Sequence, residues 1–119
     1  MTQDWHELTK LLSADVRKLR AGAAEVMKAF GAMSIAASAA NALDAKTKEL
    51  IALAIGVSTR CDDCIAFHSK AAVEKGATRE EVLETLGMAI YMGAGPSAMY
   101  ASHALAAFDQ FAEAKAKAA

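Results

Sequence analysis

The chain has 119 residues, a length that corresponds to one domain, and we expect a single domain over residues 1–119. Alanine contributes 30 residues, whereas valine and isoleucine contribute five each and proline only one. Alanine has the highest helix propensity, and the shortage of β-branched and aromatic side chains leaves little material for strands. The composition therefore predicts an all-α domain of closely packed helices and excludes a β-sandwich, a β-barrel or a disordered chain.

Charged side chains are balanced, with 13 Lys and Arg against 14 Asp and Glu, and the formal net charge is −1. The basic residues are interleaved with acidic and apolar ones, which argues against a nucleic-acid partner. The first ten residues are charged and lack the apolar core of a signal sequence. The longest low-charge stretch, 29–42, is too short and too weakly apolar to span a membrane. We therefore expect a cytoplasmic protein with no membrane partner.

The spacing of apolar residues and the positions of capping residues predict a series of helices. In chain order these cover 5–12, 13–30, 34–40, 45–57, 61–75, the segment from 78 through 90, and the segment from 97 into an Ala- and Lys-rich tail that should fray. The helix at 34–40 is expected to be short and buried. The helix that follows Asp44 is apolar on every side, which predicts a central, buried position. Thr78 and Glu81 form a capping box, and the segment Gly93–Pro96 breaks the helix that they open.

Two cysteines and a histidine lie close together in the segment 61–68, which reads CDDCIAFH. At about 100° per residue, Cys61, Cys64 and His68 share one narrow stripe of a helix. Their side chains should face the interior or a cleft, with Asp62 and Asp63 on the opposite, solvent-exposed face. Cys61 begins the helix, where free backbone N–H groups stabilise a thiolate, and Cys64 lies one turn before His68. A cysteine pair with this spacing can close a disulfide and reopen it.

Glu49 lies on the preceding helix, on a face that also carries small residues. If the two helices form an antiparallel hairpin about the link near Arg60, Glu49 lies opposite the neighbourhood of His68. This geometry predicts a chain Glu49–His68–Cys64, in which the carboxylate orients the imidazole and the imidazole takes the thiol proton. Since a free cysteine has a pKa near 8.5, such a base raises its thiolate fraction near neutral pH.

The residues alone leave three readings of the cysteine pair open: redox chemistry, metal binding and inert burial. In a reducing compartment, two cysteines three residues apart favour catalysis or metal binding over a structural disulfide. A zinc site would need a fourth ligand beside the cysteines and His68, which Glu49 or His103 could supply. Two cysteines within one helix nevertheless suit a structural zinc site poorly, and His103 is expected to pack or to cap a helix.

The spacing Glu49-x11-Cys61-x2-Cys64-x3-His68 resembles the signature of the alkylhydroperoxidase D-like branch of the carboxymuconolactone decarboxylase family. The surrounding sequence is similar to that family in the segments 42–54, 75–81 and 89–93. The resemblance covers about residues 14–111, which we take as the core of the domain. It implies an all-α, single-domain helical bundle of the alkylhydroperoxidase D-like type.

The resemblance also implies a thiol-dependent, peroxiredoxin-type peroxidase that acts in antioxidant defence. In the family, the residue that matches Cys64 attacks the hydroperoxide, assisted by the matches of Glu49 and His68. Cys61 then resolves the sulfenic acid to a disulfide, which a dithiol or thioredoxin-like electron donor reduces. No cofactor and no metal ion are expected. Single-repeat members usually assemble as trimers or hexamers, so the resemblance implies a homo-oligomer.

This chain departs from the family pattern at one position between the cysteines. Well-known members carry a histidine just before the second cysteine, whereas this chain has Asp63. An acid at this position disfavours the Cys64 thiolate, which leaves the rate and the electron donor open. The alternatives are a general disulfide oxidoreductase, a carboxymuconolactone decarboxylase-like enzyme and a non-enzymatic, metal-binding helical module. The decarboxylases of the family lack the cysteine pair, which disfavours their reaction here.

Overall fold

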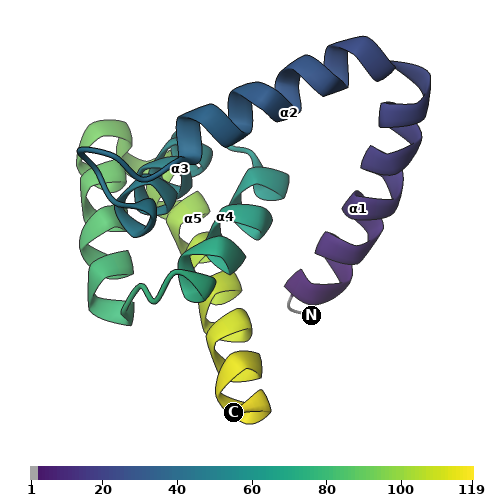
Figure 1. The fold of residues 1–119 in the computed structure, drawn as a ribbon. Coiled ribbons are helices and arrows are strands. Elements are labelled where there is room, and N and C mark those ends of the chain that lie inside the picture. Colours follow the sequence, from purple (N-terminus) through teal and green to yellow (C-terminus); the bar gives the residue numbers. More distant parts are fainter. Residues whose placement is uncertain (1–2) are drawn as a thin grey trace.

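The computed structural model describes residues 3–119. In this range the chain forms five helices and no strand, so the all-α prediction is confirmed (Figure 1). The helices are α1 (Trp5–Gly22), α2 (Ala24–Ser38), α3 (Ala45–Ser58), α4 (Asp62–Glu74) and α5 (Arg79–Ala118). Among the described residues, no helix is both long enough and apolar enough to cross a membrane.

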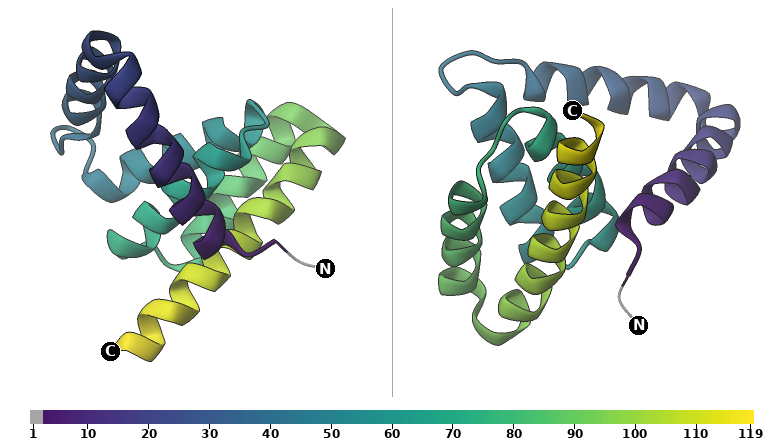
Figure 2. Two further views of the ribbon diagram at one scale, coloured as in Figure 1. Left: turned by 90° about the vertical axis from the view of Figure 1, so that its right-hand side faces the viewer. Right: turned by 90° about the horizontal axis from the view of Figure 1, so that it is seen from below.

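Helices α3, α4 and α5 pack against one another around the hydrophobic core, and the first turn of α1 closes it (Figure 1, Figure 2). The core side chains include Leu53, Val57, Ile65, Ala66, Ala72, Val82, Leu86, Ala104, Ala107 and Phe108. Several of these are alanines, which allow the helix backbones to approach closely. Trp5 is the contribution of α1, and its backbone N–H donates to Gln110 Oε1 at 2.9 Å.

Helix α5 is divided by a sharp turn at Ala94, inside the predicted break (Figure 2). Ala94 has φ 55° and ψ −141°, and Pro96 two residues later lacks a backbone N–H. Gly93 has no side chain, and a Cβ there would collide with the buried side chain of Ser97. Because the chain reverses here, the two halves of α5 lie side by side.

Local signals place the boundaries of the core helices. Asp44 caps α3 by accepting the backbone N–H of Thr47 at 2.7 Å. The Thr47 side chain and, second, this backbone N–H lower the pKa of the Asp44 carboxyl. Thr78 and Glu81 form the predicted capping box of α5. Lys46 of α3 donates to Glu81 Oε2 at 2.8 Å, which holds the pKa of Glu81 below its ordinary value. The same ion pair joins the start of α3 to the start of α5.

Beyond the first turns of α1, in which Trp5 and Thr9 are buried, α1 and α2 form an arm that extends away from the core (Figure 1). The predicted boundary at Ser13 is wrong, because α1 continues through it to Gly22 and the break falls at Ala23, with φ −119° and ψ 54°. Strong helix formers on both sides of Ser13 outweigh its preference for a cap. The expected short, buried helix at 34–40 is also wrong, since this segment belongs largely to α2, which has no buried residue.

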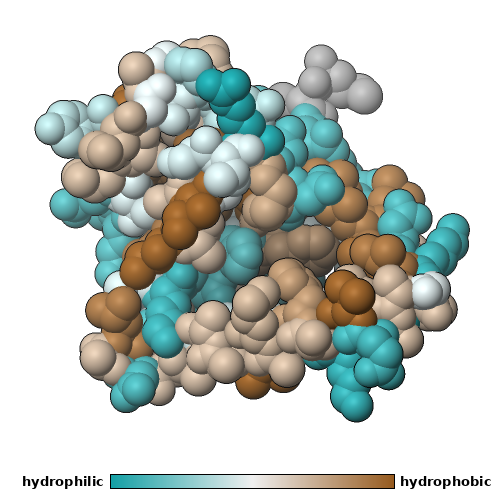
Figure 3. Space-filling model, turned by 90° about the horizontal axis from the view of Figure 1, so that it is seen from above, coloured by the Kyte–Doolittle hydropathy of each residue, from teal (hydrophilic) through white to brown (hydrophobic). Residues whose placement is uncertain are grey.

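Several apolar side chains that the sequence suggested for the interior are exposed in the single chain. Only one face of α3 is buried, so the prediction of a helix buried on every side is wrong: Ile51 and Ile55 are exposed. Apolar side chains also gather along α2 (Figure 3). The tail does not fray as expected, because α5 remains helical to Ala118. An alanine-rich segment can form a helix without packing against a neighbour, so these segments are helical although they are not buried.

Candidate active site

The cysteine pair lies at the N-terminus of α4, half-buried beside the end of α3. Cys61 is the N-cap residue, and its Sγ accepts the backbone N–H of Cys64 at 3.1 Å. The two sulfurs are bonded as a disulfide with 5.2 Å between the Cα atoms, which lies within the range of ordinary disulfides. The backbone N–H of Cys61 donates to Gly56 O at 3.0 Å. The cysteine pair is therefore tied to both helices of the α3–α4 hairpin.

Gly56 is a point of close approach between α3 and Cys64. A Cβ atom at Gly56 would lie 3.3 Å from the Cβ of Cys64 and 3.6 Å from the backbone nitrogen of Ile65. The hydrogen atom that occupies this position lets the two backbones come together. The small-residue face expected on this helix is thus explained by direct contact with the second cysteine.

Glu49 and His68 meet across the same hairpin, as the sequence geometry predicted. His68 Nδ1 lies 2.8 Å from Glu49 Oε2. The Glu49 side chain is 12% exposed, whereas the His68 side chain is 38% exposed. Because a carboxylate can only accept, the Nδ1–H donates, and Nε2 is left with the lone pair that can take a proton. Within residues 3–119 no hydrogen bond joins His68 to either sulfur of the disulfide.

The two aspartates between the cysteines have different surroundings. Asp63 is exposed, as expected, and the Asp62 side chain is also 45% exposed but is bonded to a side chain of α5. Asp62 Oδ1 lies 2.8 Å from His103 Nδ1 on α5, and both side chains are partly buried. From the sequence, His103 was expected to pack or to cap a helix, with a fourth zinc ligand as the alternative, and its bond to Asp62 was not predicted. The contact was missed because it joins positions 41 residues apart, and no local pattern marks such a pair.

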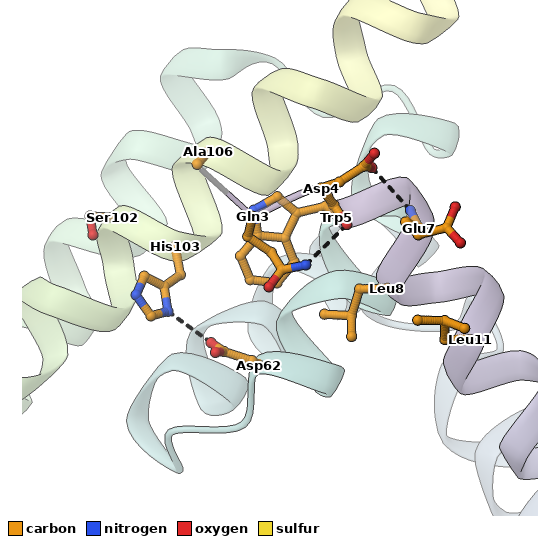
Figure 4. Close-up of a pocket in the computed structure, with 10 residues that line it drawn as sticks. All are labelled: Gln3, Asp4, Trp5, Glu7, Leu8, Leu11, Asp62, Ser102, His103 and Ala106. Carbon is orange, nitrogen blue, oxygen red and sulfur yellow. Dashed lines mark hydrogen bonds and ion pairs between the residues drawn. The ribbon is translucent and has the colours of Figure 1, made fainter. Parts of the chain in front are cut away.

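A groove runs beside this aspartate–histidine pair, between α1 and the second half of α5 (Figure 4). It has a volume of about 900 Å³. Its lining includes Asp4, Trp5, Leu8, Leu11, Asp62 and His103. The groove therefore offers an apolar wall from α1 and a polar end at the start of α4.

The described residues include no group of three or more His, Cys, Asp and Glu side chains arranged to hold a metal ion. In the disulfide form, the zinc ligand set considered from the sequence is thus not assembled. Glu49 and His68 bond to each other, and His103 bonds to Asp62.

Comparison with known proteins assigns the chain to a family. The model of the carboxymuconolactone decarboxylase family matches residues 24–107, which contain all four candidate site residues. The chain belongs to the carboxymuconolactone decarboxylase family. An uncharacterised family relative from Cupriavidus necator is 51% identical over 83 residues, which cover 70% of this chain and 74% of the relative. An uncharacterised protein encoded in the cox locus of Paracoccus denitrificans is 43% identical over 76% of this chain and 81% of its own.

Solved structures give the same assignment. A carboxymuconolactone decarboxylase family protein from Legionella pneumophila superposes with a TM-score of 0.88 at 50% identity, over 91% of this chain and 96% of that chain. A family protein from Thermotoga maritima superposes with a TM-score of 0.72 at 32% identity, over 76% of this chain and 94% of that chain. The Thermotoga protein is described as a candidate for involvement in an antioxidative response. The all-α bundle is thus the fold of this carboxymuconolactone decarboxylase family member.

Proposed function

We propose that this family member is a thiol-dependent, peroxiredoxin-type peroxidase that reduces hydroperoxides through Cys61 and Cys64. The observation that carries the proposal is the Glu49–His68 pair, bonded at 2.8 Å, one helical turn from Cys64. A carboxylate, an imidazole and a cysteine in this order form a set that activates a thiol nucleophile. The antioxidative context stated for the Thermotoga relative supports the same class of chemistry.

In the first step, the reduced Cys64 attacks the hydroperoxide. His68 Nε2 takes the thiol proton, and the thiolate sulfur forms a bond to one oxygen of the substrate ROOH. The O–O bond breaks, and the leaving alkoxide takes a proton to give ROH. Cys64 is oxidised to a sulfenic acid and the peroxide is reduced by two electrons. The position of Cys64 in the first turn of α4 supports its thiolate, because the helix N-terminus favours negative charge.

In the second step, Cys61 resolves the sulfenic acid. The sulfur of Cys61 attacks the sulfur of Cys64, the S–O bond breaks and water leaves, which yields the Cys61–Cys64 disulfide. A dithiol or thioredoxin-like donor then reduces this disulfide by exchange and is itself oxidised to a disulfide. The 5.2 Å separation of the Cα atoms supports this step, because the disulfide closes inside the folded chain. The donor thiols fit the reducing cytoplasm that we propose as the location.

The positions of Glu49 and His68 explain how the proton is handled. The largely buried Glu49 carboxylate fixes the imidazole through Nδ1 and stabilises the positive charge that His68 gains on taking the proton. The partly exposed His68 can then return the proton to the leaving alkoxide. General acid–base catalysis of this kind contributes about 100- to 10,000-fold to a rate.

Steady-state turnover of a hydroperoxide with dithiothreitol tests the proposal. The Cys64→Ser variant is expected to lose turnover to the background rate, and Cys61→Ser to lose most of it, because its sulfenic acid must be reduced by the donor directly. Unchanged turnover in Cys64→Ser would contradict the proposal. Disulfide exchange in the wild type without peroxide turnover would favour a general disulfide oxidoreductase. Ring-opening decarboxylation that survives both substitutions would favour a decarboxylase.

We also propose that copies of the chain associate as a trimer or hexamer. Support comes from the apolar side chains that α2 leaves exposed, among them Val26, Phe30 and Ile35. Covering such side chains removes apolar surface from water at about 25 cal/mol per Å². Analytical ultracentrifugation should give a mass of three or six times 12.4 kDa, and Ile35→Glu should lower it. A wild-type mass of one chain would contradict the assembly.

A further inference from the structure

The Asp62–His103 contact joins the start of the redox helix to α5 and is not used in the proposed proton chain. Asp62 directly follows Cys61 and occupies the first turn of α4. His103 Nδ1 lies 2.8 Å from Asp62 Oδ1, so the imidazole donates to the carboxylate (Figure 4). Among the hydrogen bonds of residues 3–119, this is the one that joins a side chain of α5 to the first turn of α4.

The imidazole of His103 is held in place by aromatic neighbours. The ring centroid of Tyr100 lies 5.0 Å from it, and that of the buried Trp5 lies 6.2 Å away. Trp5 comes from α1, Tyr100 from the preceding turn of α5, and Asp62 from α4. The side chain of His103, 42% exposed, thus has neighbours from three helices.

We propose that His103 is a positioning residue that holds the Asp62 carboxylate on the α5 side of the helix and so sets the redox equilibrium of the Cys61–Cys64 pair. The inference rests on the proposed redox use of the two cysteines, although it does not depend on which oxidant they meet. A carboxylate beside a thiolate disfavours the ionised, reduced form. The bond to His103 keeps that carboxylate engaged and directed toward α5, which limits the repulsion.

The proposal is testable because substitutions of Asp62 and of His103 should shift the dithiol–disulfide equilibrium in opposite directions. Asp62→Asn removes the negative charge, so the equilibrium with dithiothreitol should move toward the dithiol by about threefold to tenfold. His103→Leu removes the donor and frees the carboxylate, so the equilibrium should move toward the disulfide by about twofold to fivefold. His103→Asn keeps an N–H donor near the position of Nδ1 and should restore most of the wild-type value.

A double-substitution cycle separates this role from a structural one. If His103 acts through Asp62, His103→Leu should have no effect on the equilibrium in the Asp62→Asn background. The matched control is Asp63→Asn, which also removes a first-turn carboxylate but one that is exposed. In the Asp63→Asn background, His103→Leu should shift the equilibrium as much as it does in the wild type. His6→Leu, at a second histidine packed against α5, should leave the equilibrium unchanged.

The measurement is the ratio of dithiol to disulfide protein at fixed ratios of reduced to oxidised dithiothreitol, read by alkylation and mass spectrometry. An equal shift by His103→Leu in the Asp62→Asn and wild-type backgrounds would overturn the inference. So would a shift of His103→Leu toward the dithiol, or lowered thermal stability with an unchanged equilibrium. Peroxide is absent from this experiment. A wild type without peroxidase activity would therefore overturn the proposed function without affecting this test of His103.

Discussion

Replacing His68 with Gln is expected to lower steady-state peroxide turnover by about 100-fold or more, because the thiol loses its proton acceptor. The glutamine side chain can still donate to Glu49, so the carboxylate keeps a partner and the fold should survive. The matched control is His6→Gln, because His6 is also half-buried but packs edge-on against Phe111, away from the cysteines. Its turnover should match the wild type. Equal rates for the two variants would contradict a proton-transfer role for His68.

Glu49→Gln extends the same prediction to the residue that positions the imidazole. Its amide oxygen can accept the Nδ1–H of His68, but a neutral amide cannot stabilise the imidazolium that forms on proton transfer. We expect turnover to fall by about tenfold to 100-fold, in line with the loss of a residue that orients a functional histidine. The pH at which turnover reaches half its maximum should also change, whereas a purely structural role would lower the rate without moving the pH profile.

Gly56→Val is expected to lower the free energy of unfolding by about 1–3 kcal/mol, as overpacking of a closely packed contact does. A Cβ at this position already comes within 3.3 Å of the Cβ of Cys64, and the two γ-carbons of valine need still more room. Because Cys64 must give way, we also expect the Cys61–Cys64 disulfide to form more slowly. Urea unfolding and the rate of thiol loss after peroxide addition measure the two effects.

Gly87 supplies the matched control for this substitution. It lies inside α5, and a Cβ there would meet no atom within 4 Å. Gly87→Ala should therefore raise the free energy of unfolding by about 0.5–1 kcal/mol, the usual gain on replacing glycine inside a helix. Gly56→Ala should show less of this gain, because its Cβ must push Cys64 aside. A full gain at Gly56, or no loss in Gly56→Val, would contradict a tight contact between α3 and α4.

The part of the site that could be predicted from the sequence lies within the α3–α4 hairpin. Here the caps, the short link and the helical period act over a few residues, so Glu49 could be placed opposite His68 before any coordinates were known. The cysteines fall on the same hairpin, and their i, i+3 spacing at a helix start brings their Cα atoms within reach of a disulfide. Capping and helical periodicity are enough to predict these contacts, because the residues that make them are close in the sequence.

The remaining features depend on packing between distant segments. The Asp62–His103 contact was not predicted, because the charge pattern of α4 carries no information about His103 on α5. The arm formed by α1 and α2 shows the same limit, since alanine favours a helix whether or not a neighbour covers it. Burial of the segment 34–40 and of Ile51 and Ile55 was expected from their apolar sequence, but these surfaces have no partner within the described residues of one chain.

The most direct test of the central proposal is a single turnover of the reduced Cys61→Ser protein with one equivalent of hydroperoxide. Without the resolving thiol, the sulfenic acid should persist on Cys64, where a cyclic 1,3-dione captures it and peptide mass spectrometry locates the adduct. We expect an adduct on Cys64 in Cys61→Ser and a much weaker one on Cys61 in Cys64→Ser. An adduct on Cys61 formed equally fast, or peroxide consumed with no sulfenic acid on Cys64, would contradict the proposal.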